Sequence, residues 1–212
     1  MELITHILSF FQKGGAFMYP IALVLVVGIA IAVERFLLLS KAERENRELW
    51  GQLLPLIGQK DFEAAERVAA ASPSAVGRVM TSALVHARTV GATRTELEMS
   101  VEESLMEVTP IIEKRTHYLA TISNMSTLLG LLGTVIGLIG AFAALAKADA
   151  AQKADLLSAG ISEAMNCTAF GLLVAIPFLI IHTYLQTRSN ELIDSLEVAC
   201  MKLVNARSST KS

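Results

Sequence analysis

Residues 127–142 read TLLGLLGTVIGLIGAF, and residues 161–181 read ISEAMNCTAFGLLVAIPFLII. Apart from Glu163, neither stretch contains an acid or a base. Segments of about 18 or more largely uncharged apolar residues are long enough to cross a bilayer as helices. The glycines and hydroxyls within them indicate helices that pack tightly against partners around something polar.

The composition also points to a membrane protein. The 212 residues are 53% hydrophobic and 18% charged, with a net charge of −2 and a mean hydropathy of +0.52. A near-neutral chain argues against nucleic acid as a main partner. Cys167 lies inside an apolar stretch and Cys200 in a polar one, so a disulfide framework is not expected, and no Cys/His spacing predicts a metal site.

A third apolar stretch lies near the N-terminus and runs into Glu34-Arg35. It lacks the short apolar core and small-residue cleavage site of a signal peptide, so we interpret it as a retained span. Lys and Arg gather after this span, before the second and after the third, which predicts that these flanks are cytoplasmic. The N-terminus is then periplasmic and the C-terminus cytoplasmic.

These patterns predict an all-α membrane protein with three transmembrane helices and long cytoplasmic helical extensions. The predicted segments are an interfacial helix over 1–15, spans over 16–39, 119–146 and 161–186, a cytoplasmic helical segment over 40–118, a periplasmic connector over 147–160, and a cytoplasmic helix and tail over 187–212.

The cytoplasmic segment carries its own helix signals. Asp61 precedes a carboxylate-rich first turn, and helical character continues from about Thr93 into the second span, where Pro110 predicts a kink. A long projecting helix needs a neighbour to bury its apolar side. The helically spaced residues Leu192, Leu196, Ala199 and Leu203 are the expected neighbour.

The second span carries hydroxyls on one face. Thr127 and Thr134 are seven residues apart and so share a face, and we consider both as lining a polar path. The alternative is that each hydroxyl bonds back to a carbonyl one turn earlier, as membrane threonines often do. The glycines at 130, 133, 137 and 140, with Gly171 in the third span, predict close helix packing.

Glu163 and Asn166 are three residues apart at the start of the third span, so they also share a face. Glu163 has two interpretations. It is either a carboxylate complementing the dipole of a helix N-terminus, or an ionisable group at membrane depth and hence a functional residue.

No acid or base lies deep in any of the three spans. A proton relay normally needs a titratable group. If the protein conducts ions, the carboxylate therefore comes from another chain, which predicts an obligate partner.

Two of these motifs resemble a known family. GLLGTVIGLIGAF (130–142) and ISEAMNCTAFGLLVAIP (161–177) closely resemble segments of the MotA/TolQ/ExbB proton-channel family, and GGAFMYPIALVLVVGIAIAVERF (14–36) is similar to the start of its ExbB-like branch. The similarity runs from about Gly14 to Arg188 and is weakest in the cytoplasmic segment. Three spans fit ExbB and TolQ better than the four-span MotA subunits.

The resemblance implies an inner-membrane subunit that assembles as a ring, a pentamer, around the single-span helices of an ExbD/TolR-like dimer. That partner carries the membrane aspartate that takes up the ion. Thr134 and Thr168 match the family's pore-facing threonines, and Glu163 matches its acid. The resemblance further implies rotation driven by the proton motive force, with force passed to a TonB-like protein that works at the outer membrane.

Three alternatives remain at this point. Asn166 and Cys167 add polar ligands beside Thr168, so Na⁺ competes with H⁺ as the translocated ion, although H⁺ is preferred. A passive oligomeric scaffold would use the same small residues for packing alone. An enzyme is not expected, because the sequence has no phosphate-binding glycine loop, zinc spacing or catalytic triad, and no cofactor is predicted.

Overall fold

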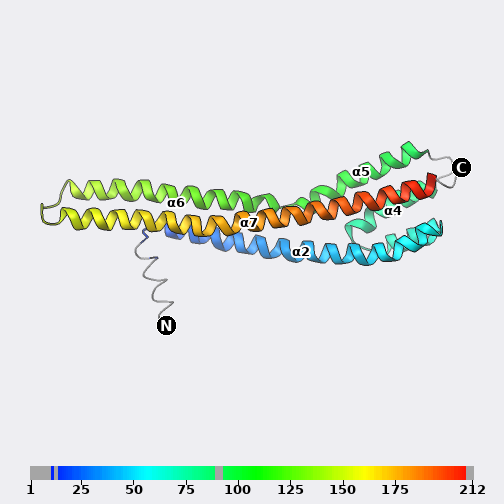
Figure 1. Cartoon of the computed structure of the whole chain (residues 1–212), viewed down its shortest axis with the longest axis horizontal. Coiled ribbons are helices and arrows are strands. Elements are labelled where there is room, and N and C mark those ends of the chain that lie inside the picture. Colours follow the sequence, from blue (N-terminus) through cyan, green and yellow to red (C-terminus); the bar gives the residue numbers. More distant parts are fainter. Residues whose placement is uncertain (1–10, 12–13, 89–92, 209–212) are drawn as a thin grey trace, which may run out of the picture. The chain divides into compact units, whose positions relative to one another are not determined.

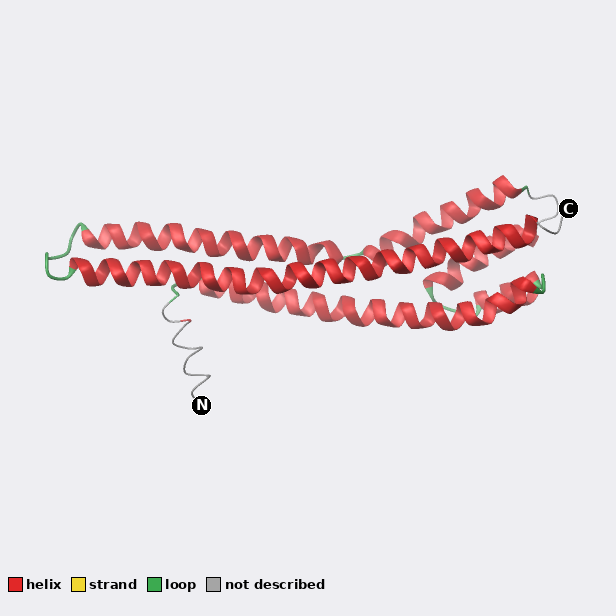
Figure 2. Ribbon diagram, in the orientation of Figure 1, coloured by secondary structure: helices red, strands yellow, loops and turns green. Residues whose placement is uncertain are grey.

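The computed structural model describes residues 11, 14–88 and 93–208, and in them it contains helices and no strand (Figure 2). This confirms the prediction of an all-α protein. The interfacial helix expected over 1–15 lies almost entirely outside the described residues. The described helices are α2 (Met18–Gly58), α3 (Phe62–Ala70), α4 (Ala75–Arg88), α5 (Arg94–Glu113), α6 (Thr116–Leu145) and α7 (Lys153–Ser208).

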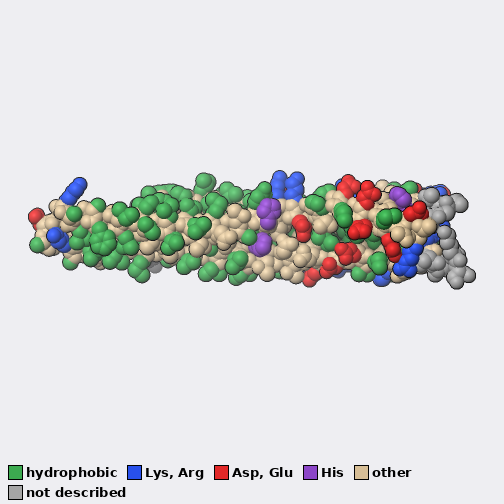
Figure 3. All heavy atoms as spheres, turned by 90° about the horizontal axis from the view of Figure 1, so that it is seen from above, with side chains coloured by type: hydrophobic (Ala, Val, Ile, Leu, Met, Phe, Trp, Pro, Cys, Tyr) green, Lys and Arg blue, Asp and Glu red, His purple; other side chains and the backbone are tan. Residues whose placement is uncertain are grey.

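Within the described residues, three helical stretches are long and apolar enough to cross a membrane: Met18–Gly58, Arg94–Leu145 and Lys153–Arg207. Most large apolar side chains of their apolar windows point outward, as Figure 3 shows for one face. Exposed apolar area on this scale is costly in water and requires a bilayer or another chain as its surroundings. The chain is therefore a membrane protein with three spanning helices.

The chain divides into two compact units. Unit 1 consists of Met1–Val33 and Arg115–Thr183, and unit 2 of Glu34–Lys114 and Tyr184–Ser212. The long helices α2 and α7 contribute residues to both units.

Unit 1 is a bundle of the first part of α2, the whole of α6 and the first part of α7 (Figure 1). The α6 and α7 helices run antiparallel and side by side, joined by a short connection, so α7 begins inside the expected connector 147–160. The ring of Phe178 occupies the space beside Gly28, where α2 meets α7. Close approach of this kind requires a residue without a side chain.

Unit 2 holds the helices that the polar segment was predicted to form. Asp61 caps α3 by accepting a hydrogen bond from the amide of Ala64 at 3.0 Å, and Thr93 and Glu96 form a capping box at the start of α5. The α4 helix packs against both α3 and α5. The predicted apolar stripe of α7 is buried, as expected, at Leu192, Leu196, Ala199 and Leu203.

The helical run from Thr93 is broken at Lys114 and Arg115, although the kink was predicted at Pro110. Pro110 lies inside α5. Its missing N–H removes only one helical hydrogen bond, so the helix continues on both sides of the proline. The backbone instead leaves the helix at Lys114 (ψ 131°), and Arg115 adopts a left-handed conformation (φ 66°). In unit 2 the buried guanidinium of Arg35 donates a hydrogen bond to the carbonyl of Ile112, which stabilises this helix end.

Cys200 gives a prediction for unit 2. The thiol is fully buried, and burial, with a smaller effect of Glu197, raises its pKa to about 12. At pH 8 only about one thiol in ten thousand is then ionised, so alkylation of Cys200 should be very slow in the folded protein and fast after unfolding. Mass spectrometry of peptides after iodoacetamide treatment measures this directly, and rapid labelling of the folded protein would contradict the assignment.

The same raised pKa predicts a dependence of stability on pH. An unfolded thiol loses its proton near pH 9, whereas the folded one keeps it until about pH 12. The contribution of the Cys200 thiol to the free energy of unfolding is therefore complete below pH 9 and declines as the pH rises from 9 to 12. A Cys200→Ala variant should lack this part of the alkaline decline.

Candidate functional site

The hydroxyls of Thr134 on α6 and Thr168 on α7 are in direct hydrogen-bond contact across the helix pair of unit 1. Both also lie within reach of the Gly130 carbonyl oxygen, at 3.2 Å from Thr134 and 3.0 Å from Thr168. The carbonyl oxygen of Ala164 is 3.4 Å from the Thr134 hydroxyl. We call these four oxygens the Thr134–Thr168 oxygen cluster.

The oxygen cluster has more acceptors than donors. Each threonine hydroxyl has one proton and two lone pairs, and each carbonyl keeps a second lone pair after accepting its helical N–H bond. Two protons therefore serve four oxygens. The cluster can accept a further hydrogen bond from a protonated group, or contribute oxygen ligands to a small cation.

Glycines allow the backbones of α6 and α7 to approach at the oxygen cluster. A Cβ atom built on Gly171 would lie 2.7 Å from the carbonyl oxygen of Ser126 and 3.0 Å from Cα of Gly130. One on Gly130 would lie 3.2 Å from the carbonyl oxygen of Cys167. Because backbone atoms fill this space, a side chain at Gly171 would force the helices apart, and one at Gly130 would need its neighbours to shift by a few tenths of an ångström.

The other predicted packing glycines differ in their surroundings. Gly133 lies against Cys167 and Phe17, and Gly137 lies against Ala164, where an added Cβ would be 3.2 Å from the alanine methyl. A Cβ on Gly140 would meet no atom within 4 Å, so this glycine does not pack within the described part of unit 1. Its packing role stays a prediction.

Thr127, Glu163 and Asn166 lie outside the oxygen cluster. The Thr127 hydroxyl donates to the carbonyl of Ser123 at 3.2 Å, one turn back on its own helix. Glu163 is exposed, and its carboxylate lies against Gly15, which has a positive φ of 74°. Asn166 is half-buried on α7. Because α7 begins at Lys153, Glu163 is in the third turn, too far inside for the helix-dipole interpretation.

Two contacts between α6 and α7 were not predicted. The Ser123 hydroxyl donates to the carbonyl of Ala175 at 2.8 Å, and Gly160 packs against Ala141. The signal for Gly160 was present in the sequence, since Gly160, Ala164, Thr168 and Gly171 place small residues at intervals of three or four. The serine bond spans 52 positions and has no local signal.

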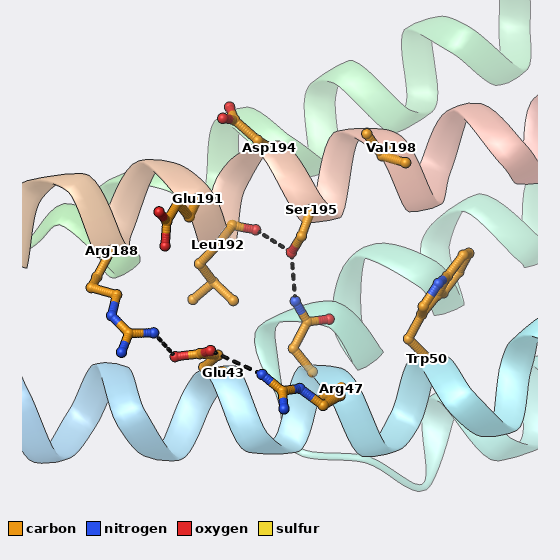
Figure 4. A pocket seen from close by; sticks show the side chains of 10 residues that line it. Glu43, Arg47, Trp50, Arg188, Glu191, Leu192, Asp194, Ser195 and Val198 are labelled. Carbon is orange, nitrogen blue, oxygen red and sulfur yellow. Dashed lines mark hydrogen bonds and ion pairs between the residues drawn. The ribbon is translucent and has the colours of Figure 1, made fainter.

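Unit 2 contains a groove of about 440 Å³ between α2 and α7 (Figure 4). Its polar groups bond to one another: Glu43 pairs with Arg188 at 2.6 Å and with Arg47 at 3.2 Å, and Asn46 donates to Ser195 at 2.7 Å. Its lining is Glu43, Asn46, Arg47, Trp50, Arg188, Glu191, Leu192, Asp194, Ser195 and Val198. Hydrogen bonding to Tyr184, and then the charge of Glu43, raise the pKa of Arg188.

The groove has the character of a structural seam between two helices. Glu43, Arg188 and Ser195 are held by ion pairs or hydrogen bonds within it, and no cluster of three metal-ligating side chains occurs anywhere in the described residues. The Thr134–Thr168 oxygen cluster is therefore the candidate functional site. Together with the three spanning helices, it defines a multi-pass membrane protein with a polar pair between two tightly packed helices.

Comparison with known proteins identifies the family. The model of the MotA/TolQ/ExbB proton channel family matches residues 70–198, more than half of the chain, and includes Thr134 and Thr168. A putative biopolymer transport protein, ExbB-like 3, from Synechocystis sp. is 29% identical over 170 residues, covering 80% of each chain. The ExbB homolog of Methanothermobacter thermautotrophicus is 29% identical over 195 residues, covering 91% of this chain and 67% of its own.

A shorter match is found to the Tol-Pal system protein TolQ of Haemophilus influenzae, which is 35% identical over 79 residues, 37% of this chain and 34% of the relative. The chain belongs to the MotA/TolQ/ExbB proton channel family. The names of its relatives place it with the ExbB-like biopolymer transport proteins. The resemblance inferred from the two span motifs is thereby confirmed.

Proposed function

We propose that this protein is the ring-forming channel subunit of an ion-driven machine in the bacterial inner membrane. A ring of copies, most simply five, encloses the single-span helices of an ExbD/TolR-like dimer. The translocated ion drives motion of the ring, and a TonB-like protein carries the force to the outer membrane. In this role the chain is not an enzyme and needs no cofactor.

The oxygen cluster carries this proposal. It offers spare hydrogen-bond acceptors between two apolar helices, while residues 120–145 and 164–181 contain no acid or base. A protonated carboxylic acid on a partner helix would donate to such a cluster, and its carboxylate would not. The threonines thus favour the protonated form of an acid that the partner supplies.

We propose H⁺ as the translocated ion, with Glu163, Asn166 and Thr127 along its path on either side of the cluster. Glu163 is exposed and lies toward the connection between α6 and α7, which the Lys/Arg distribution places on the periplasmic side. The four clustered oxygens also suit Na⁺, a cation that prefers oxygen ligands, so sodium dependence is the specific alternative.

The experiment is to co-express the chain with an ExbD/TolR-like protein and to measure the mass of the purified complex by native mass spectrometry. We expect a ring of identical copies that retains the partner. Replacing the partner's membrane Asp with Asn should leave the ring intact and abolish ion-driven activity. A single copy, or a ring that never retains a single-span partner, would contradict the proposal.

A further inference from the structure

The outward face of α5 in unit 2 carries an unusual combination of residues. Met99 and Met106 are 56% and 67% exposed, and their spacing of seven places them on one face with Glu103 between them. Methionine is flexible and polarizable, and exposed methionines are typical of contact surfaces. We call this surface the α5 ridge; it comprises Met99, Glu102, Glu103, Met106 and Glu107.

The carboxylates of the α5 ridge have no ion-pair partner in the described residues. By contrast, carboxylates on the neighbouring helices pair with a Lys or Arg one turn away, as in Lys41–Glu45, Arg44–Glu48, Arg47–Glu43 and Arg67–Glu63. Glu103 and Glu107 are four residues apart, and like charges at this spacing destabilise a helix. A cationic surface packed on the ridge would relieve this repulsion.

The outward face of α2 supplies such a surface. The side chains of Lys41 and Arg44 are 71% and 75% exposed, and their nearest carboxylates lie at 3.7 and 3.8 Å, beyond hydrogen-bond distance. Exposed pairs of this kind are weak and easily exchanged. Arg47 differs, because it turns toward Glu43 in the groove (Figure 4).

The two faces lie at the same level along unit 2. Arg35 bonds to the carbonyl of Ile112, and α2 and α5 run in opposite directions (Figure 1). Arg44 is nine residues after Arg35, and Glu103 is nine residues before Ile112. Arg44 and Glu103 therefore lie at the same height along the helix axes of unit 2, to within about one turn, 5.4 Å.

The two faces belong to different sides of the unit. Away from the Arg35–Ile112 bond, the α7 helix bonds to α2 through Asn46 and Ser195, and to α5 through Arg94 and Asn205 at 3.4 Å, so at this level α7 lies between them. Different faces that complement each other form a heterologous contact, which closes into a ring when repeated by rotation. Rotation about an axis along the helices preserves height, so Glu103 of one copy arrives level with Arg44 of the next.

We propose that the α5 ridge of one copy packs against Lys41 and Arg44 on α2 of the neighbouring copy. This contact is the cytoplasmic part of the interface between subunits, and it rests on the ring of the proposed function. Glu103 pairs with Arg44 and Glu107 with Lys41, while the two methionines cover the stems of the basic side chains.

A crosslinking experiment on the partner-bound complex in membranes tests this interface. Arg44→Cys and Glu103→Cys are combined in a Cys167→Ala, Cys200→Ala background, which removes the two native thiols, and treated with a short bis-maleimide. We expect a ladder of crosslinked subunits that is absent from either single-cysteine variant. The matched controls pair Glu103→Cys with Arg67→Cys on α3, or with Asp194→Cys in the groove.

The controls and the assembly mass separate the possible failures. If Glu103→Cys crosslinks with Asp194→Cys and not with Arg44→Cys, the α5 ridge packs in the groove of the neighbouring copy, and the proposal is overturned. An intact ring in which neither pair gives a ladder would also overturn it. A wild-type complex that is not a ring overturns the proposed function itself. Charge exchange is the second measurement: Glu103→Arg or Arg44→Glu alone should lower the temperature at which the ring dissociates, and the double exchange should restore it.

Discussion

Replacing Gly171 with alanine is expected to force α6 and α7 apart and to prevent assembly of the complex. The added Cβ would lie 2.7 Å from the Ser126 carbonyl oxygen and 3.0 Å from Cα of Gly130, and backbone atoms cannot move aside locally. Overpacking of this kind costs about 1–3 kcal/mol, a large part of the stability of most domains. The measurement is the thermal midpoint of the purified protein, with the yield of the partner-bound complex.

The matched control is Gly140→Ala on α6, the neighbouring helix of unit 1. An added Cβ there meets no atom within 4 Å, so the same substitution should leave the protomer as stable or slightly more stable, by about 0.5–1 kcal/mol. If Gly140→Ala instead prevents ring formation while the protomer stays folded, Gly140 lies in a contact with another chain. Equal thermal midpoints for Gly171→Ala and wild type would contradict the close approach of the two helices.

Replacing Thr134 and Thr168 with valine is expected to remove ion-driven activity while leaving assembly intact. Valine keeps the shape of threonine but lacks the hydroxyl, so the oxygen cluster loses both of its side-chain acceptors. Leaving a buried donor without its acceptor costs about 1–3 kcal/mol, so ion flux should fall about five- to a hundredfold for each threonine that accepts from the partner's protonated acid.

Serine variants provide the control for the hydroxyls. Thr134→Ser and Thr168→Ser keep the oxygen in place and should retain most of the flux, whereas a defect in packing would affect serine and valine variants alike. Thr121→Val is the second comparison, because that hydroxyl bonds to the carbonyl of His117 on its own helix and is not among the residues of the proposed ion path. Full flux in the double valine variant would rule out the cluster as part of the ion path.

The oxygen cluster shows which contacts can be predicted from the sequence and which cannot. The spacing of Thr127 and Thr134 predicts a shared face, and the resemblance pairs Thr134 with Thr168. The contact of Thr168 with the Gly130 carbonyl, 38 positions away, depends on the antiparallel register of α6 and α7. That register is set by contacts between glycines of α6 and glycines of α7, and the sequence of either span alone does not predict which glycines face each other.

The break before α6 escaped prediction for a related reason. Proline is the usual signal for a helix interruption, yet Pro110 stays within α5 and the chain turns at Arg115, a residue with no preference for the left-handed region. The bond from Arg35 to Ile112 joins positions 77 apart, so it leaves no local pattern. Local caps such as Asp61 and Thr93, whose partners lie three residues away, were predictable.

The most direct test of the central claim, that the chain conducts protons only together with an acid supplied by a partner, is flux into proteoliposomes. Purified complexes with and without the ExbD/TolR-like partner are reconstituted, and acidification is followed under an imposed membrane potential in sodium-free and sodium-containing buffers. The account predicts flux in sodium-free buffer that requires the partner and its membrane Asp. Flux from the chain alone, or flux that appears only with sodium, would contradict it.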